Sequence, residues 1–157
     1  MKVKASSLVL GVCLAIMAVV AAPAFARSNT AFSAYHVENP LGSDPYTCVT
    51  EDNGAVFNNC TYTVSLEFDL PIDNAGEKTV TVRDFWQGTA AQNTFNCYLY
   101  AYTGTSGTSI EGTPAIAFNG ISQTASTTVN VASGSNMQLI CWNIPPQGGV
   151  ANLSWNQ

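Results

Sequence analysis

An alternation of apolar and polar residues with a period of two constrains the fold of this chain most. Every second residue from Tyr62 to Leu70 is apolar, and the residues between them are polar. Successive side chains of a β-strand point to opposite faces, so this run predicts a strand with one buried face. Similar runs occur at residues 78–86, 95–102, 121–131 and 151–155. No segment longer than one turn has a 3.6-residue period, so no helix is predicted.

The predicted fold class is all-β. With shorter runs at residues 46–50, 115–118 and 137–144, the chain has about eight strands, separated by turn signals such as Asn53-Gly54. This number is typical of an antiparallel two-sheet β-sandwich of immunoglobulin-like or jelly-roll topology. We expect residues 45–157 to form this single domain. Residues 27–44 show little periodicity and predict a loosely structured N-terminal arm or one short edge strand.

The first 26 residues have the organisation of a secretory signal peptide. Lys2 and Lys4 precede an apolar stretch at residues 8–20, and Ala24-Phe25-Ala26 forms a small-x-small cleavage site. Cleavage after Ala26 leaves no membrane span and predicts a secreted or periplasmic protein. If the signal is not cleaved, residues 5–26 are long enough to act as a membrane anchor.

The charge balance excludes polyanionic partners. All ten carboxylates follow residue 26, against only three cations, Arg27, Lys78 and Arg83, which leaves a formal charge of −7. This charge repels nucleic acid and anionic membrane surfaces. Charged residues are otherwise scarce beside Thr, Ser, Asn and Gly, as is typical of an exported β protein.

Four cysteines follow the signal, and an even number in a small exported chain predicts disulfides. Three connectivities are possible, of which we expect Cys48–Cys60 and Cys97–Cys141. A three-residue hairpin loop at residues 53–55 places Cys48 opposite Cys60. Cys97 and Cys141 each lie on the apolar face of a strand, so both point into the predicted core.

Metal sites are not predicted. The cysteine spacings contain no close pair, and the one histidine, His36, lies in the arm, so a zinc site is not expected. Residues 51–53 and 69–74 hold clustered oxygen ligands of the kind calcium requires, but at no known calcium-loop spacing. No cofactor is predicted.

Catalytic groups are few. Nucleophilic catalysis needs a base that is held rigidly against the nucleophile. His36 lies in the arm, so we do not expect it to act as such a base. Glu67 and Asp69 share one strand face about 7 Å apart, a separation that invites comparison with a glycosidase pair. Such pairs normally face one another across a cleft, whereas these side chains project in parallel. We therefore expect surface ion pairs with Arg83 of the following strand.

The candidate binding residues are Tyr98, Tyr100 and Tyr102, which alternate along one strand face, while Trp86, Trp142 and Trp155 lie elsewhere in the strands. Aromatic rows can stack on sugar rings or anchor a protein interface. Alternatively, the tyrosines lie under a loop or fill a second layer of the sandwich.

The leading functional hypothesis is a non-enzymatic secreted or periplasmic binding domain. It recognises carbohydrate or a cell-surface component, such as a cell-surface protein, through the tyrosine face. An alternative is a structural or self-assembling cell-surface subunit. A third hypothesis is a hydrolase that uses Glu67 and Asp69.

Overall fold

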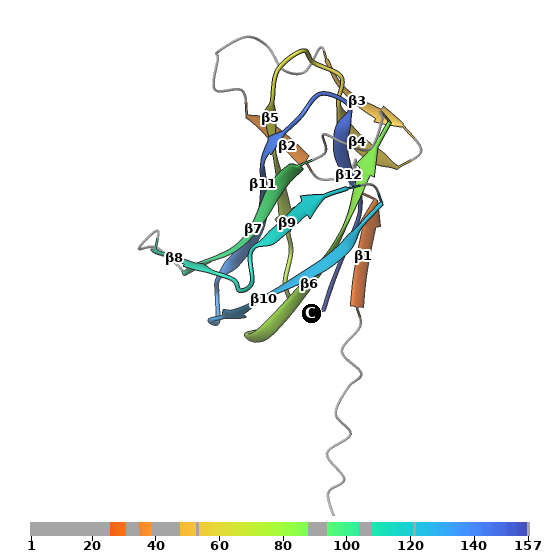
Figure 1. Ribbon diagram of the computed structural model, residues 1–157. Helices are drawn as coiled ribbons and strands as arrows, with labels where there is room; N and C mark the ends of the chain where they lie inside the picture. The colour runs from red at the N-terminus through yellow and green to blue at the C-terminus, as the bar shows by residue number, and fades with distance from the viewer. Residues whose placement is uncertain are drawn as a thin grey trace, which may run out of the picture.

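The protein is a sandwich of two antiparallel β-sheets (Figure 1). The computed structural model describes residues 26–30, 35–38, 48–52, 54–87, 94–103, 108–120 and 122–156, and the signal peptide predicted over residues 1–26 lies outside these residues except for Ala26. Twelve strands lie within the described ranges. No helix in this part of the chain has the length and apolar character needed to cross a membrane.

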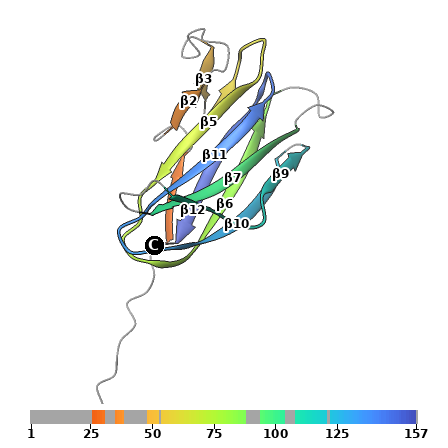
Figure 2. The ribbon, with the colours of Figure 1, turned by 90° about the vertical axis from the view of Figure 1, so that its left-hand side faces the viewer.

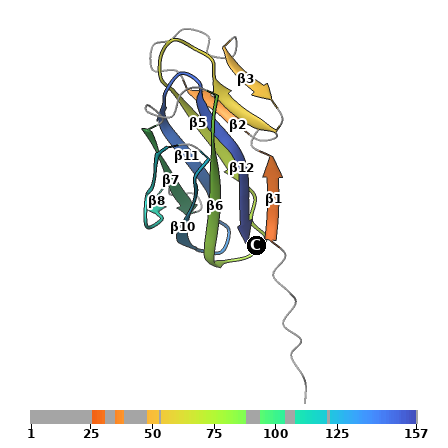
Figure 3. The same ribbon diagram turned by 45° about the vertical axis from the view of Figure 1, so that its right-hand side comes forward.

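The first sheet, sheet A, has the strand order β10-β6-β12-β4-β3, and β1 pairs with β12 beyond the end of β4. Figure 3 shows β6, β12 and β1 side by side. The strands of sheet A are β1 (Ala26–Thr30), β3 (Val49–Asp52), β4 (Ala55–Asn58), β6 (Gly76–Trp86), β10 (Thr124–Val131) and β12 (Gly148–Asn156).

The second sheet, sheet B, has the order β2-β5-β11-β7-β8, and β9 also pairs with β7. In Figure 2 it faces the viewer, with β5, β11 and β7 side by side. The strands of sheet B are β2 (Tyr35–Glu38), β5 (Val64–Leu70), β7 (Thr94–Thr103), β8 (Thr108–Glu111), β9 (Ile116–Asn119) and β11 (Asn136–Ile144).

The predicted two-sheet sandwich is confirmed. Consecutive strands from β9 to β12 alternate between the sheets, which is the jelly-roll member of the two predicted topologies. Eight of the twelve strands coincide with the predicted runs. The other four, β1, β2, β4 and β8, lie outside the predicted runs and have four or five residues each.

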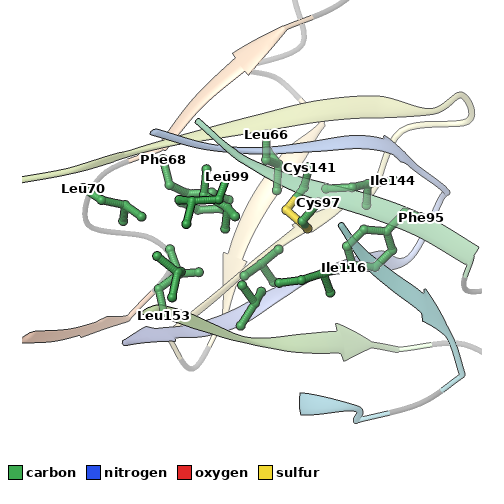
Figure 4. Packing of buried hydrophobic residues seen from close by; sticks show 14 of the residues in the cluster. Leu66, Phe68, Leu70, Phe95, Cys97, Leu99, Ile116, Cys141, Ile144 and Leu153 are labelled. Atoms are coloured by element: carbon green, nitrogen blue, oxygen red, sulfur yellow. A yellow bond between two sulfur atoms is a disulfide. The ribbon is translucent and has the colours of Figure 1, made fainter. Parts of the chain in front are cut away.

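The core lies between the inner faces of the two sheets. Leu66, Phe68 and Leu99 of sheet B are at most 1% exposed, and Leu153 of sheet A points towards them (Figure 4). The apolar faces predicted by the alternation are therefore the buried faces. The indole Nε1 of Trp155 donates a hydrogen bond of 2.9 Å to the main-chain oxygen of Pro71, so this tryptophan is a structural residue.

Both predicted disulfides form, but the hairpin that carries one of them has a different register. Asp52 pairs with Ala55, not with Val56, so the loop has two residues. Asn-Gly strongly favours two-residue hairpins, and Gly54 has a φ of 85°. In this register Cys48 lies beside Asn59, whose N–H donates to its main-chain oxygen at 2.9 Å.

The Cys48–Cys60 bridge nevertheless closes, with a Cα–Cα distance of 4.9 Å, because Cys60 lies beyond the end of β4. The other bridge joins Cys97 and Cys141, which are directly paired on β7 and β11 and fully buried. Figure 4 shows this second bridge in the core.

The segment expected as a loose arm or one edge strand contributes two strands. β1 pairs with β12 over five residue pairs, and β2 pairs with β5 over four. Sheet pairing needs only main-chain groups, so a segment without apolar alternation can still extend a sheet edge. The sandwich therefore includes strands that precede the predicted boundary at residue 45.

Candidate functional site

Tyr98, Tyr100 and Tyr102 form a row on the outer face of β7. The alternate residues Cys97, Leu99 and Ala101 are fully buried on the inner face, whereas the three tyrosines are half-buried. Neighbouring ring centroids are 6.4 Å and 6.2 Å apart. Two residues of strand advance by about 6.8 Å, so the pleat of β7 sets the ring spacing.

The neighbouring strand β11 provides the floor beside this row. Its register pairs Asn136 with Tyr102, Gln138 with Tyr100, and Ile140 with Tyr98. Ile140 is only 7% exposed although it lies on the outer face, so its neighbours on that face cover it. The row thus borders the apolar side chain of Ile140 at the Tyr98 end and the amide groups of Asn136 and Gln138 towards the Tyr102 end.

Trp142 extends the aromatic surface. It pairs with Asn96 of β7, one position beyond Ile140 along the same outer face, and is half-buried. Trp86 lies on β6 of sheet A and Trp155 is buried, so the structure brings only one of the three tryptophans to the tyrosine face.

Glu67 and Asp69 lie on the outer face of β5, on the other side of β11 from the tyrosines. The side-chain amide of Gln138 donates to a carboxylate oxygen of each, at 3.3 Å in both cases. The two carboxylates therefore lie on one sheet face and share the side-chain amide of Gln138 as a hydrogen-bond donor. Gln138 is also the residue opposite Tyr100 in the register of β11 and β7. Carboxylates that project in parallel from one face can accept hydrogen bonds from the hydroxyl groups of a polyol. They do not face one another across a cleft, as the two carboxylates of a glycosidase do.

The prediction that these carboxylates form ion pairs with Arg83 is wrong. Arg83 lies on β6 in sheet A, exposed on the opposite outer face, beside Thr124 and Asn152. The chain crosses from one sheet to the other between β5 and β6, so these consecutive strands are not hydrogen-bonded neighbours. Strand faces follow from alternation, whereas sheet membership does not.

A depression of about 620 Å³ adjoins the Tyr102 end of the row. Asp69 and Asn136 supply its polar groups from the outer face of the sheet, and Leu70 and Met137 supply apolar ones. Among the residues that the structure describes, Pro71 and Ile72 of the connection after β5 complete the lining of this depression.

Negative charge surrounds the tyrosine hydroxyls. Burial, followed by the charge of Glu111, raises the pKa of Tyr100 above its ordinary value of 10.0. Burial, followed by the charge of Glu67, likewise raises the pKa of Tyr102. Both hydroxyls therefore stay protonated and able to donate hydrogen bonds at neutral pH.

The other candidate residues do not assemble into a reactive centre. His36 lies on β2 opposite Glu67 in the register. Asn74, in one of the oxygen-rich turns, accepts a 2.6 Å hydrogen bond from the amino group of Lys78. Within the described ranges, no three His, Cys, Asp or Glu side chains are grouped so that they could hold a metal.

Sequence reasoning missed two neighbours of the tyrosines, Asn136 and Gln138, and placed a third, Trp142, elsewhere in the strands. Alternation within residues 136–142 places all three on the polar face of their strand. Only the pairing of β11 with β7 shows that this face adjoins the tyrosine row.

No protein-family model and no curated protein matches the sequence. Solved structures do match the fold. A family 35 carbohydrate-binding module from Cellvibrio japonicus Abf62 has 20% identity and a TM-score of 0.50, covering 83% of this chain and 92% of that one. The module from Paenibacillus barcinonensis has 17% identity, a TM-score of 0.50, and coverage of 81% and 95%.

The family 35 module from Clostridium thermocellum has 15% identity, a TM-score of 0.50, and coverage of 84% and 98%. At these identities the likeness concerns the fold. The chain thus shares its two-sheet sandwich, over most of its length, with modules named as carbohydrate-binding.

Proposed function

We propose that this protein is a non-enzymatic carbohydrate-binding domain whose site is the outer face of sheet B. The observation that carries the proposal is the row of half-buried Tyr98, Tyr100 and Tyr102 beside the carboxylates and amides of β5 and β11. Sugar rings combine apolar C–H faces with hydroxyl edges, and a surface of aromatic faces with adjacent acceptors matches both.

The shape of the surface supports the same function. The spacing of the tyrosine rings offers successive stacking positions along β7. The depression beside Tyr102 has a volume within the usual range of small-molecule sites, about 300–1,000 Å³. An extended glycan would lie along the row with one end in this depression.

The shared fold of the three family 35 modules is a further argument for this function. The two disulfides are the usual staples of a domain that works in an oxidising compartment, and we infer a secreted or periplasmic protein. Its partner would be a free glycan or the glycan of a cell-surface component. Glu67 and Asp69 are assigned to hydroxyl recognition rather than to hydrolysis.

A glycan array followed by titration calorimetry tests the proposal. Replacing any one of the three tyrosines with alanine should weaken binding by about three- to tenfold, because each ring loses a stacking contact. Tyrosine-to-phenylalanine variants keep the ring and should retain most of the affinity. Phe85→Ala removes a half-buried ring from sheet A and should leave binding unchanged.

The bound glycan should be recovered uncleaved after prolonged incubation with the protein. Failure to bind any glycan, or binding that none of the three alanine variants weakens, would contradict the proposed site. Release of shorter sugars that Glu67→Gln abolishes would instead support the hydrolase hypothesis.

A further inference from the structure

Lysine and arginine are confined to one of the two sheets, whereas the described strands of each sheet hold four carboxylates. Only three lysine or arginine residues follow residue 26, and all three lie on strands of sheet A, Arg27 on β1 and Lys78 and Arg83 on β6. The described strands of sheet B contain four carboxylates and neither lysine nor arginine, with His36 of β2 as their one imidazole. These carboxylates are Glu38, Glu67, Asp69 and Glu111.

The two cations of β6 cannot compensate for the charge of sheet B. Lys78 is 1% exposed, and its amino group donates to Asn74. Arg83 is exposed on the opposite outer face of the sandwich, beside Thr81 and Ser154. The tyrosine face therefore has no fixed positive group from β6 to balance its carboxylates.

Carboxylates flank the tyrosine row on both sides. Glu111 of β8 pairs with Tyr100 from one side and is exposed. On the other side, beyond β11, lie Glu67 and the exposed Asp69, which also lines the depression next to Tyr102. A chain bound along the row would therefore pass between negative charges.

We propose that the carbohydrate bound on this face is an amino-sugar chain with protonated amino groups. This inference rests on the proposed function and names its ligand class. An ammonium group is attracted to the electron-rich face of an aromatic ring and forms charge-assisted hydrogen bonds with carboxylates. The tyrosine row and the flanking carboxylates together supply both kinds of partner.

The same charges act against other glycans. A uronate or sulfated chain brings like charge to Asp69 and Glu111 and is repelled. A neutral chain can still stack on the tyrosines but forms no ion pair. The expected order of affinity is therefore amino sugar first, neutral sugar second and anionic sugar last.

Calorimetric titration of the disulfide-bonded protein with two matched ligands tests this order. The ligands are a β-1,4-linked glucosamine hexamer, at a pH where its amines are protonated, and the same hexamer with every amine acetylated. The charged hexamer should bind about tenfold more tightly or better. Its advantage should shrink between about 20 mM and about 300 mM sodium chloride, as the ion pairs are screened.

Matched charge variants locate the effect. Asp69→Asn and Glu111→Gln should each weaken binding of the charged hexamer several-fold more than binding of the acetylated hexamer, so that the affinity ratio of the two ligands falls. Glu77→Gln removes the same charge from an exposed position on sheet A and is the control. Equal loss in all three variants would indicate general attraction to an acidic protein and would overturn the inference.

The inference and the proposed function fail in different ways. If the acetylated hexamer or another neutral glycan binds as tightly as the charged one, and the tyrosines are required, the amino-sugar inference is wrong and the proposed function stands. If neither hexamer binds, the inference fails. If no glycan on an array binds either, the proposed function fails with it.

Discussion

Cys97 and Cys141 are directly paired on β7 and β11, with their Cα atoms 4.0 Å apart, and their disulfide lies on the inner face of sheet B. The next pair along the ladder is Tyr98 and Ile140, on the outer face. The bridge thus holds together the two strands whose register places the tyrosines beside their polar neighbours. A covalent link in the core supports the geometry of the candidate site.

Removing this bridge with the double change Cys97→Ala and Cys141→Ala should lower the free energy of unfolding by about 4 kcal/mol, because a long loop regains its freedom in the unfolded chain. Glycan affinity should fall as well, since β7 and β11 are less firmly held. Urea denaturation and calorimetry measure the two effects.

The other disulfide is the matched control. Replacing Cys48 and Cys60 with alanine should cost about 3 kcal/mol, because the closed loop is shorter. This bridge flanks the β3–β4 hairpin of sheet A, so glycan affinity should not change. An equal loss of affinity in both double variants would contradict a specific role for the Cys97–Cys141 bridge.

Asn58 is fully buried and connects three segments through its side chain. Its amide nitrogen donates to the main-chain oxygens of Tyr62 at 2.7 Å and Ile144 at 2.8 Å, and its amide oxygen accepts from the N–H of Cys60 at 2.8 Å. Asn58→Ala should therefore destabilise the protein by about 2–4 kcal/mol, because buried main-chain groups lose their partner.

Urea denaturation of Asn58→Ala measures this loss, with the exposed Asn130→Ala as its control. The control should change stability by less than about 0.5 kcal/mol. A loss as small for Asn58→Ala as for the control would show that the three hydrogen bonds contribute little.

Asp84 is buried on β6, and this burial raises the pKa of its carboxyl above the ordinary value of 3.8, although Gln123 and Arg83 act in the opposite direction. The folded protein therefore binds the proton more tightly than the unfolded chain. Stability should fall as the pH rises from about 3.8 through the raised folded-state pKa. Asp84→Asn removes this loss and should be more stable than the parent at neutral pH.

Unfolding by urea over a pH series checks the prediction. The advantage of Asp84→Asn should disappear below pH 3.8, where the carboxyl is protonated in both states. Asp52→Asn, at an exposed position of β3, is the matched control. A variant that is less stable than the parent at neutral pH would show that the ionised carboxylate is favourable in the folded state.

The tyrosine hydroxyls report the charges around the site. After burial, Glu111 is the main cause of the raised pKa of Tyr100, and Glu67 that of Tyr102. Glu111→Gln should therefore lower the pKa of Tyr100, and Glu67→Gln should lower that of Tyr102. Alkaline titration by NMR of ring-labelled tyrosines separates the individual groups. Equal shifts of both tyrosines in both variants would contradict this assignment.

The sequence was sufficient for the features that depend on local alternation or on cysteine position. The face shared by Tyr98, Tyr100 and Tyr102 was predictable because side chains of a strand alternate. The inward direction of Cys97 and Cys141 followed from the same rule. The predicted register of the β3–β4 hairpin was wrong by one residue, because register depends on loop length and the prediction used a three-residue loop.

The candidate site was less predictable, because its partners come from separate strands. Gln138 lies beside Tyr100 and between the carboxylates of β5 only because β11 is inserted between β5 and β7. Arg83, on the strand that follows Glu67 in the chain, lies on the opposite outer face because β6 belongs to sheet A.

By itself, the sequence determined the all-β class, the buried face of each long strand and the two disulfide partners, because these depend on periodicity and on the few cysteines available. The tertiary structure alone decided which strands share a sheet, and hence that the tyrosine row adjoins carboxylates and amides while Arg83 lies on the opposite outer face. Main-chain hydrogen bonds between strands are nearly independent of side-chain identity, so strand order is set by the packing of the whole domain.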